Sequence, residues 1–493
     1  MDQSISFLLD ANIVIALEPT SPEDIEGGTA AVVELPRLAS EAGCPLLVHP
    51  AVDVDIRADP DVQRRALRRT LLKKYPRLPD PPPVPAAWLT AFGHPEQGSN
   101  DWVDNQLLAA VDADAVDYLV TEDRGLHRKA RRLGLQNRVA HTGEALSILR
   151  GLFDVVPEPP PAVRHVKAHA LNADDPIFNG LRRDYPRFDA WLQEAKRRRR
   201  HAWVIDGAEG RHAAICIVKR ERQAEHGLGS TALKICTFKV SEGHGGYRFG
   251  ELLLKAVFEH ARANGYRRAY ITVFEKHREL IDLLEEFGFE SSDTRTRLGE
   301  LVLVKSLSPS SDDWDELDPL RFNRRYGPFA ARIRDVPTFV VPIRPQFHRI
   351  LFPDAEDQAA LWPGAHPFGN SIRKAYLCNA QIRSLSPGAN LLFYRSEDVR
   401  AVTVLGVVED TMVTHSAPEA ARFVGKRTVY TFREIEELCT CPLLAILFRQ
   451  SRVLVEPIAL GELIAHGVVK ATPQSIVSVP KEATEWLETR LRV

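Results

Sequence analysis

Residues 241–263 read SEGHGGYRFGELLLKAVFEHARA, and this stretch decides the fold of the middle of the chain. Its first ten residues include four glycines, and glycine adopts turn conformations that other residues avoid. The remainder places leucine, valine and phenylalanine at helical spacing, which predicts an amphipathic helix over residues 251–263. The stretch therefore predicts a glycine-rich turn that opens directly into a helix.

Apolar runs on both sides of this stretch predict strands and a second helix. The strand-like runs before it are AWVID at 202–206, AAICIVKR at 213–220 and ALKICTFKV at 232–240. After it come the strand-like YRRAYITVF at 266–274, the helical HRELIDLLEEF at 277–287 and a closing GFE at 288–290. Strands and helices around one turn predict an α/β fold for this segment.

This order of elements resembles the GNAT acyltransferase fold over residues 163–306. The resemblance implies acetyl-CoA as the cofactor, its pyrophosphate held by backbone N–H groups at the turn and at the start of the helix. The positions that this implies are Val240, Gly245, Gly246, Arg248, Phe249 and Gly250. Such a module would acetylate the amine of an aminoacyl-tRNA or of a protein.

Two positions depart from the pattern of that family. Arg248 stands where its turn has a middle glycine, and Leu284 stands where a tyrosine often serves as the acid. Because leucine cannot protonate a leaving thiolate, Tyr270, Glu275 and His277 are the alternative acids. A GNAT fold kept as a rigid spacer or as a protein-binding module is the other interpretation of this segment.

Acidic residues adjoin strand-like or helical runs in the first 150 residues. They are Asp10 in SFLLDANIVIAL, Asp53 and Asp55 in HPAVDVDI, Asp104 in NDWVDNQLLAAV and Asp123 in DYLVTED. The carboxyl ends of parallel strands share one edge of an α/β sheet, so acids there can converge. Converging carboxylates repel unless a cation lies among them, and their oxygens suit Mg²⁺ or Mn²⁺. The alternative is that each acid caps a helix or a turn.

This ordered set resembles a PIN-domain nuclease over residues 4–150. The resemblance implies a parallel α/β/α sandwich in which a bound metal activates water to cut single-stranded or structured RNA. Its metal-binding and catalytic acids would be Asp10, Asp55, Asp104 and Asp123, with Asp53 as the alternative to Asp55. The basic runs at 64–74 and 124–132, the second starting at Arg124, would attract phosphate or form solvated helix faces.

The last part of the chain has short β-rich runs between proline, glycine and asparagine clusters, which predicts a small β-barrel. SPGANLLFYRS followed by VTVLGVVED resembles the PUA-like superfamily, in its ASCH or EVE branch, over residues 335–493. The resemblance implies an RNA-facing cleft. The candidate RNA contacts are Arg373, Lys374, Arg395, Lys426, Arg427 and Gln474, although a charged residue at the surface is the default interpretation.

The length and two breaks in composition predict the domain organisation. The chain has 493 residues, which at about 150 per domain predicts three domains. The breaks are VPEPPP at 156–161 and SLSPSSDDWDELD at 306–318. We expect a PIN-like domain at 1–155, a GNAT-like domain at 156–306, a linker at 307–336 and a PUA-like domain at 337–493. This is a multidomain α/β protein with a terminal barrel.

Composition limits the class of protein. The chain is 44% hydrophobic and 26% charged, which is typical of a soluble globular protein, and its net charge of −2 excludes a uniformly basic nucleic-acid coat protein. Six cysteines are too few for a disulfide scaffold. No run reaches the ~20 apolar residues of a membrane span, so we expect a cytoplasmic protein that does not bind membranes.

All three segments predict the same partner, which is RNA in the form of tRNA or mRNA. The leading prediction is a toxin-like, Mg²⁺- or Mn²⁺-dependent endoribonuclease with accessory acyltransferase and RNA-binding modules. A toxin would also need a neutralising antitoxin protein, and the chain could form an oligomer. The first alternative is an acetyl-CoA-dependent N-acetyltransferase acting on tRNA or protein, whose PIN-like domain binds RNA. The second is a non-catalytic regulator that binds RNA and protein.

Overall fold

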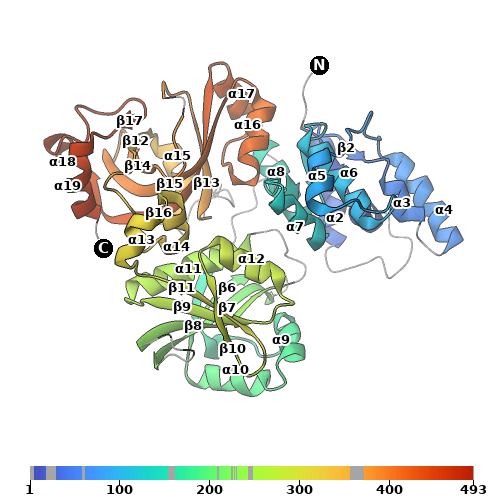
Figure 1. Ribbon diagram of the computed structural model, residues 1–493, viewed down its shortest axis with the longest axis horizontal. Coiled ribbons are helices and arrows are strands. Elements are labelled where there is room, and N and C mark those ends of the chain that lie inside the picture. The colour runs from blue at the N-terminus through green and yellow to red at the C-terminus, as the bar shows by residue number, and fades with distance from the viewer. Residues whose placement is uncertain are drawn as a thin grey trace. The chain divides into compact units, whose positions relative to one another are not determined.

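The computed structural model describes residues 5–17, 29–57, 61–153, 162–207, 210–223, 226, 228, 230–241, 248–355, 371–382 and 384–491 (Figure 1). The chain forms two compact units: unit 1 comprises residues 1–157, 242–247 and 414–441, and unit 2 comprises residues 158–241, 248–413 and 442–493. Within the described ranges, no helix is long and apolar enough to cross a membrane. The predicted domain boundaries stay predictions, because one compact unit can contain more than one domain.

Unit 1 is built on a parallel sheet of four strands in the order β2-β1-β3-β4. The strands are β1 (Phe7–Leu9), β2 (Leu46–Val48), β3 (Tyr118–Val120) and β4 (Val139–Ala140). Every residue of β1 and β3 is buried, so both faces of the sheet are covered, as is usual for parallel strands. The helices of the first segment are α1 (Ala11–Leu17), α2 (Thr29–Glu41), α3 (Val52–Arg57), α4 (Val62–Leu71), α5 (Ala86–Phe92), α6 (Asn100–Asp112), α7 (Arg124–Arg132) and α8 (Thr142–Phe153).

Two helices from much later in the chain also belong to unit 1. They are α16 (Ala417–Val424) and α17 (Phe432–Cys439). The Tyr118 hydroxyl donates a hydrogen bond of 2.8 Å to the carbonyl of Ala421. Arg422 donates one of 2.9 Å to Asp117, directly before β3. Residues 414–441 interrupt the segment predicted as a barrel, and they belong to the compact unit of the parallel sheet instead.

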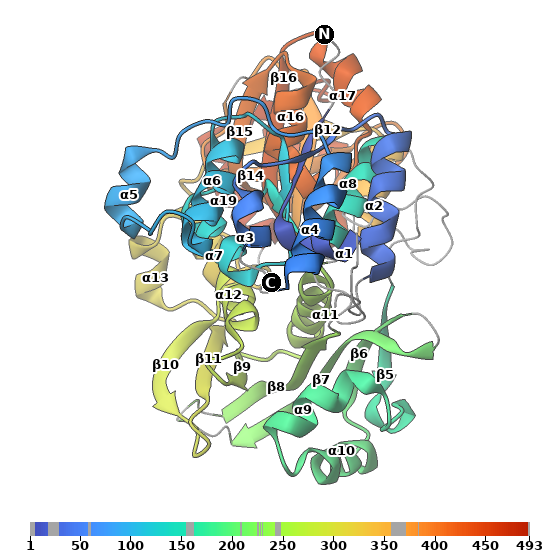
Figure 2. The same ribbon diagram turned by 90° about the vertical axis from the view of Figure 1, so that its right-hand side faces the viewer.

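Unit 2 begins with a sheet of seven strands in the order β10-β11-β9-β8-β7-β6-β5. The strands are β5 (Val163–Lys167), β6 (His201–Asp206), β7 (His212–Gln223), β8 (Ser230–Val240), β9 (Arg268–Val273), β10 (Glu290–Arg295) and β11 (Leu301–Ser306). Neighbouring strands are antiparallel except for β8 and β9, which are parallel. The helices are α9 (Asn179–Asp184), α10 (Phe188–Arg197), α11 (Phe249–Ala263) and α12 (Arg278–Glu286). Figure 2 shows α9 and α10 on one face of the sheet and α11 and α12 on the other.

The rest of unit 2 is a mixed sheet of six strands in the order β13-β16-β15-β14-β12-β17. The strands are β12 (Thr338–Ile343), β13 (Arg373–Cys378), β14 (Asn390–Arg395), β15 (Ala401–Thr414), β16 (Leu443–Ala459) and β17 (Val477–Ser478). The helices are α13 (Ser311–Glu316), α14 (Pro319–Tyr326), α15 (Pro345–Leu351), α18 (Leu460–Ala465) and α19 (Lys481–Leu491). Among the described residues β13 and β17 are the ends of the sheet, so a closed barrel is not confirmed.

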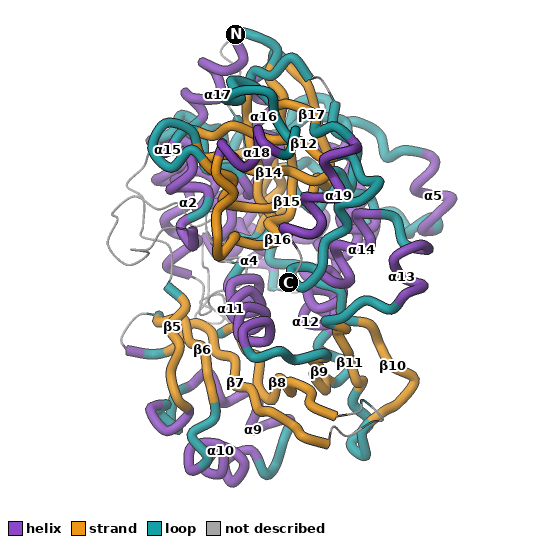
Figure 3. Tube along the Cα trace, turned by 90° about the vertical axis from the view of Figure 1, so that its left-hand side faces the viewer, coloured by secondary structure: helices purple, strands orange, loops and turns teal. Residues whose placement is uncertain are grey.

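Helix α11 connects the two sheets of unit 2, and Figures 1, 2 and 3 all place it between the seven-stranded sheet and β16. The Glu251 carboxylate in its first turn accepts backbone hydrogen bonds from Ile372, at 2.8 Å, and from Arg373, at 2.9 Å. Glu251 also pairs with Arg248 at 3.0 Å. The predicted multidomain α/β architecture is confirmed, with the two sheets of unit 2 held together by buried polar contacts.

Candidate functional site

The two parallel strands of the seven-stranded sheet part toward their carboxyl ends. Among the described residues, β8 pairs with β9 over 232–235 and 268–271. Beyond that point β8 continues along β7 to Val240, and β9 continues along β11 to Val273. The facing edges therefore leave backbone N–H and C=O groups available to a ligand. We call this place, residues 236–240 of β8 and 272–273 of β9, the strand fork.

A β-bulge marks the start of the strand fork. Ile235 pairs with Val218 and Thr237 pairs with Ile217, so Cys236 is the extra residue on β8. A bulge bends its strand and releases the backbone groups of the extra residue from the ladder. This bend explains why β8 leaves β9 directly after Ile235.

Thr237, the first residue after the bulge, carries an unused polar group. Its side chain is 3% exposed, and its hydroxyl has no hydrogen-bond partner among the described residues. A buried polar group without a partner costs about 1–3 kcal/mol. A polar ligand in the strand fork would provide the missing partner.

The amino end of α11 follows β8 through the predicted turn. Gly245 and Gly246 lie outside the described residues. Arg248, the residue before the helix, has a φ of 59°, in the left-handed region that glycine adopts most readily. At Gly250 a Cβ atom would lie 2.6 Å from a methyl group of Leu283, so α12 needs glycine there for close packing. The first N–H groups of this long helix can bind an anion.

The other predicted cofactor positions bracket the same place. Val240 is the last residue of β8, and Phe249 is the first residue of α11 and is buried. Phe238 of β8 lies 3.6 Å from the place where a Cβ of Gly250 would be, so α11 begins directly over the strand fork. The strand fork and the amino end of α11 therefore form one surface.

A half-buried tyrosine and a buried glutamate form a pair at the end of β9. The Tyr185 hydroxyl donates a hydrogen bond of 2.6 Å to Glu300, which is 5% exposed. Tyr185 also packs its ring 5.4 Å from that of Phe274, the residue after β9. Leu301, next to Glu300, pairs with Val273 at the tip of the strand fork. Burial and the carboxylate of Glu300 raise the pKa of Tyr185, so its hydroxyl keeps its proton at neutral pH.

A cavity of about 400 Å³ opens beside this pair. It is lined by Arg183, Asp184, Phe274, Glu275, Lys276 and Gly299. Helix α9 reaches the strand fork as well, because a Cβ on Gly180 would lie 3.4 Å from the Lys239 amine of β8. The cavity therefore adjoins the strand fork at the carboxyl end of β9, where Phe274 follows Val273.

Each acid predicted from the sequence has a partner in this region. His277 lies 2.8 Å from Asp184, and Glu275 pairs with Arg295 at 2.7 Å. Tyr270 is fully buried and donates to Glu221. Leu284 is fully buried in the core. The sequence does not indicate Tyr185 and Glu300 as a pair, because they lie 115 residues apart and no local pattern connects them.

Three of the four predicted nuclease acids lie close together in unit 1. The Thr121 hydroxyl donates 2.6 Å to Asp10 and accepts 2.9 Å from the backbone N–H of Asp123. Burial raises the pKa of Asp104 to about 7, and the charges of Asp123 and Asp10 add to that rise. Burial raises the pKa of Asp10 as well. The carboxyl edge of the parallel sheet thus gathers these acids, as predicted.

The predicted metal site has no support from the arrangement of these acids. Among the described residues, no group of three or more histidine, cysteine, aspartate or glutamate side chains could hold a metal ion. Asp55 lies in α3, and its side chain lies outside the described residues. The reserve ligand Asp53 pairs with Arg77 at 2.8 Å. We therefore derive no step through Mg²⁺ or Mn²⁺.

Four of the predicted RNA contacts are buried in protein contacts. Arg373 pairs with Glu409 at 3.1 Å and with Glu286. Lys374 is 0% exposed and donates to a backbone carbonyl. Arg395 and Arg427 are 7% and 2% exposed, and Arg395 pairs with Asp398. Arg124 and Gln474 are exposed, whereas the side chain of Lys426 lies outside the described residues. These four cations therefore contact protein groups more than solvent.

Comparison with known proteins supports one of the modules. Residues 167–289 match the acetyltransferase (GNAT) family, so the chain contains a GNAT acetyltransferase domain. No curated protein matches the chain. Nothing in these comparisons supports a PIN domain, so the leading nuclease prediction is without support.

Two solved structures are similar to parts of the chain. The ASCH protein of Zymomonas mobilis is 16% identical, with 32% of this chain and 96% of that one covered, at a TM-score of 0.24. The PaiA N-acetyltransferase of Thermoplasma acidophilum, solved with coenzyme A, is 10% identical, with 29% and 99% covered, at a TM-score of 0.22. Scores of this size do not establish a shared fold.

Proposed function

We propose that this protein is an acetyl-CoA-dependent N-acetyltransferase. The observation that carries the proposal is the strand fork, which opens at a bulge and lies under the amino end of α11. The match of residues 167–289 to the GNAT family supports the same reading. Acetyl transfer, the first of the two alternatives to the nuclease prediction, is therefore the function that we propose.

The residues of the strand fork fit acetyl-CoA, which supplies an acetyl thioester when it is bound. The N–H groups of Phe249 and Gly250 would hold its phosphates at the start of α11. The backbone of Cys236 and the Thr237 hydroxyl would bind polar groups of its extended arm. The Cys236 backbone and the Thr237 hydroxyl lie at the strand fork, beyond the last residue pair of β8 and β9.

Acetyl transfer to an amine forms one C–N bond and breaks the C–S bond of the thioester. The amine loses a proton, and the leaving sulfur gains one. Glu300 is the candidate base for the amine proton. Tyr185 is the candidate acid for the sulfur, because burial beside Glu300 keeps its phenol protonated. This pair takes the place of the family acid that Leu284 cannot supply.

The acceptor is proposed to be an amine of a protein or of an aminoacyl-tRNA. The cavity beside Tyr185 is lined by two acids, Asp184 and Glu275, and by two cations, Arg183 and Lys276, so it suits a polar acceptor. Asp184 is held by Lys276 and His277, so its carboxylate has a fixed direction. A cavity of about 400 Å³ fits one side chain or one aminoacyl group better than a whole folded surface.

Radiolabelled acetyl-CoA tests this proposal directly. The purified chain is incubated with labelled acetyl-CoA and either a protein mixture or aminoacylated tRNA, and transfer of label is counted. We expect transfer to one acceptor class and binding of CoA in calorimetry. No CoA binding at millimolar concentration, or no transfer to either class, would falsify the proposal.

A second candidate, the ribonuclease, is favoured by the gathered acids of unit 1. A cavity of about 420 Å³ beside Asp104 is lined by Arg128, Lys129 and Arg132, which suit a phosphate backbone. Single-stranded RNA is incubated with the protein in Mg²⁺, in Mn²⁺ and in EDTA. Cleavage with metal that Asp10→Asn plus Asp104→Asn abolishes would support this candidate. Equal cutting by the double variant would reject it.

A further inference from the structure

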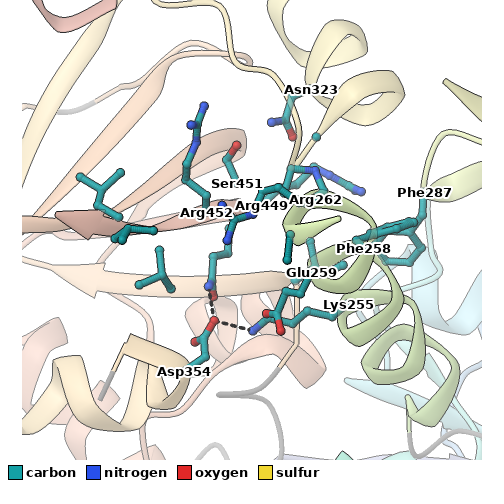
Figure 4. Close-up of a pocket in the computed structure, with 18 residues that line it drawn as sticks. Lys255, Phe258, Glu259, Arg262, Phe287, Asn323, Asp354, Arg449, Ser451 and Arg452 are labelled. Carbon is teal, nitrogen blue, oxygen red and sulfur yellow. Dashed lines mark hydrogen bonds and ion pairs between the residues drawn. The ribbon is translucent and has the colours of Figure 1, made fainter. Parts of the chain in front are cut away.

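Another cavity lies within unit 2, where β16 extends past its partner strand. β13 begins at Arg373, which pairs with Arg449, and the N–H of Gln450 still bonds the carbonyl of Ile372. Beyond that point α11 lies beside β16 and leaves a cavity of about 390 Å³ (Figure 4). This volume lies in the range of small-molecule sites.

Five buried polar atoms around this cavity have no hydrogen-bond partner among the described residues. They are Asn323 Nδ2, Asp354 Oδ1, Gln450 Oε1, Ser451 Oγ and Arg452 Nε. Asn323, Gln450 and Ser451 are 3%, 6% and 3% exposed. Native proteins leave few such atoms unpaired, so a group of five around one cavity needs an explanation. A bound polar ligand is the explanation that satisfies them together.

The unpaired atoms specify a ligand with both donors and acceptors. Gln450 Oε1 and Asp354 Oδ1 accept hydrogen bonds, the amide nitrogen of Asn323 donates them, and Ser451 does either. Lys255 and the amide nitrogen of Gln450 fix the other oxygen of Asp354, at 3.0 and 2.6 Å. The edge of a nucleobase carries this mixture of donors and acceptors.

The apolar walls suit the faces of a flat ring. Phe258, Phe287 and Leu454 line the cavity beside the polar atoms. The Arg449 guanidinium already stacks on Phe287 at 5.0 Å, which keeps that ring in place. A nucleobase places apolar faces and polar edges on one rigid body, whereas a sugar alone would leave these walls without a partner.

Two arginines on the cavity wall indicate an anionic group on the ligand. Arg262 of α11 and Arg452 of β16 form no ion pair with the described residues. Burial and the charge of Arg262 together lower the pKa of Arg452 to about 10. Two cations that raise each other's energy gain from a shared phosphate. The acid Glu259 also lines the cavity, but its side chain is exposed, so solvent screens its repulsion of an anion.

We propose that this cavity binds a nucleoside monophosphate, either free or as one nucleotide of an RNA. Its base edge meets Asn323, Gln450 and Ser451, and its phosphate meets Arg262 and Arg452. The site is separate from the strand fork, because it involves the middle and carboxyl end of α11 and not its first turn. It does not depend on the proposed acetyl transfer.

Calorimetry of the full chain with AMP, GMP, CMP and UMP tests the site. We expect at least one nucleotide to bind, with its nucleoside and inorganic phosphate each at least about tenfold weaker. Arg452→Met should weaken binding about tenfold and Ser451→Ala several-fold, at unchanged melting temperature. Arg197→Met, on the exposed face of α10, is the matched control and should bind as the parent does.

Three results would overturn the proposal. The first is that none of the four nucleotides binds at millimolar concentration. The second is that Ser451→Ala and Arg452→Met both bind like Arg197→Met. The third is that acetyl-CoA displaces the nucleotide competitively, which would assign the cavity to the cofactor.

Short oligoribonucleotides distinguish the two sources of the ligand. A five-nucleotide RNA that binds more tightly than the mononucleotide, and loses that advantage in Arg452→Met, identifies a nucleotide within RNA. An RNA that binds more weakly than the mononucleotide identifies the free compound. Either result agrees with a site that binds a nucleoside monophosphate group.

Discussion

The hydroxyl of Tyr185 donates a hydrogen bond of 2.6 Å to the carboxylate of Glu300, across 115 residues of sequence. Tyr185 follows α9 and Glu300 precedes β11, and both lie at the carboxyl end of β9. The pair places a protonated hydroxyl and a buried carboxylate at the carboxyl end of β9, next to the strand fork. In the proposed acetyl transfer, Tyr185 is the candidate acid and Glu300 the candidate base.

The first prediction concerns this pair. Tyr185→Phe removes the hydroxyl and Glu300→Gln removes the base, so each should lower kcat by about 100-fold or more while leaving CoA affinity unchanged. Steady-state kinetics with labelled acetyl-CoA measures the first effect, and calorimetry measures the second. Tyr326→Phe is the matched control, because that tyrosine bonds a carboxylate, Asp313, elsewhere in unit 2. Full activity in both variants would exclude the pair from the chemistry.

The second prediction concerns the unused hydroxyl of Thr237. Thr237→Val keeps the shape and deletes an unpaired polar group, so stability should stay level or rise while CoA affinity falls about fivefold. Thr338→Val is the control, because the equally buried Thr338 hydroxyl donates 3.0 Å to a backbone carbonyl. That change should lower stability and leave CoA binding alone. Unaltered CoA affinity in Thr237→Val contradicts the assigned role.

The third prediction concerns Glu409, which joins Arg373 and Arg449 at 3.1 Å each. Because its side chain is 6% exposed, Glu409→Gln should destabilise the fold by about 3–5 kcal/mol, by leaving the buried Arg449 without its carboxylate and Arg373 with Glu286 alone. Urea unfolding measures the loss. The control is Glu485→Gln, whose 77% exposed side chain should contribute less than about 1 kcal/mol.

The same carboxylate gives a pH dependence. Burial acts to raise the pKa of Glu409, but Arg373 and Arg449 outweigh it and hold that pKa below its usual value. A lowered pKa in the folded state stabilises the protein above the unfolded value of about 4.3 and stops doing so as the pH falls below it. The stability difference between parent and Glu409→Gln should therefore shrink at acidic pH. A constant difference would contradict the ion pair.

The fourth prediction concerns Asp104, whose pKa burial raises to about 7. A raised carboxyl pKa gives stability that is present below the unfolded pKa of about 3.9 and is lost as the pH rises through 7. Asp104→Asn should thus be more stable than the parent at pH 8 and similar at pH 4. Melting temperatures across this range measure it. Asp101→Asn, one turn away and 80% exposed, should follow the parent at every pH.

Much of the local structure could be predicted from the sequence. The helix predicted over residues 251–263 is α11, and the strand predicted over 202–206 is β6 to within one residue. The run at 118–120 is β3. These elements depend on spacing within a few residues, which a single sequence displays. The convergence of Asp10 and Asp104 was also within reach, because parallel strands share one carboxyl edge.

The burial of charged side chains could not be predicted from the sequence. Lys374 and Arg427 look like surface cations in the sequence, yet they are 0% and 2% exposed. Whether a cation meets solvent depends on which distant segments cover it. Arg427 meets Asn137 of the first segment, a contact between residues 290 positions apart. No periodicity within either segment contains that information.

By itself, the sequence determined the elements and their order, because turn residues and apolar spacing act over a few positions. The tertiary structure decided which groups are available for chemistry. It buried the predicted contact Arg373 between Glu286 and Glu409, and it joined Tyr185 to Glu300. The physical reason is that burial and hydrogen bonding are properties of packed surfaces, and those surfaces form only when distant parts of the chain meet.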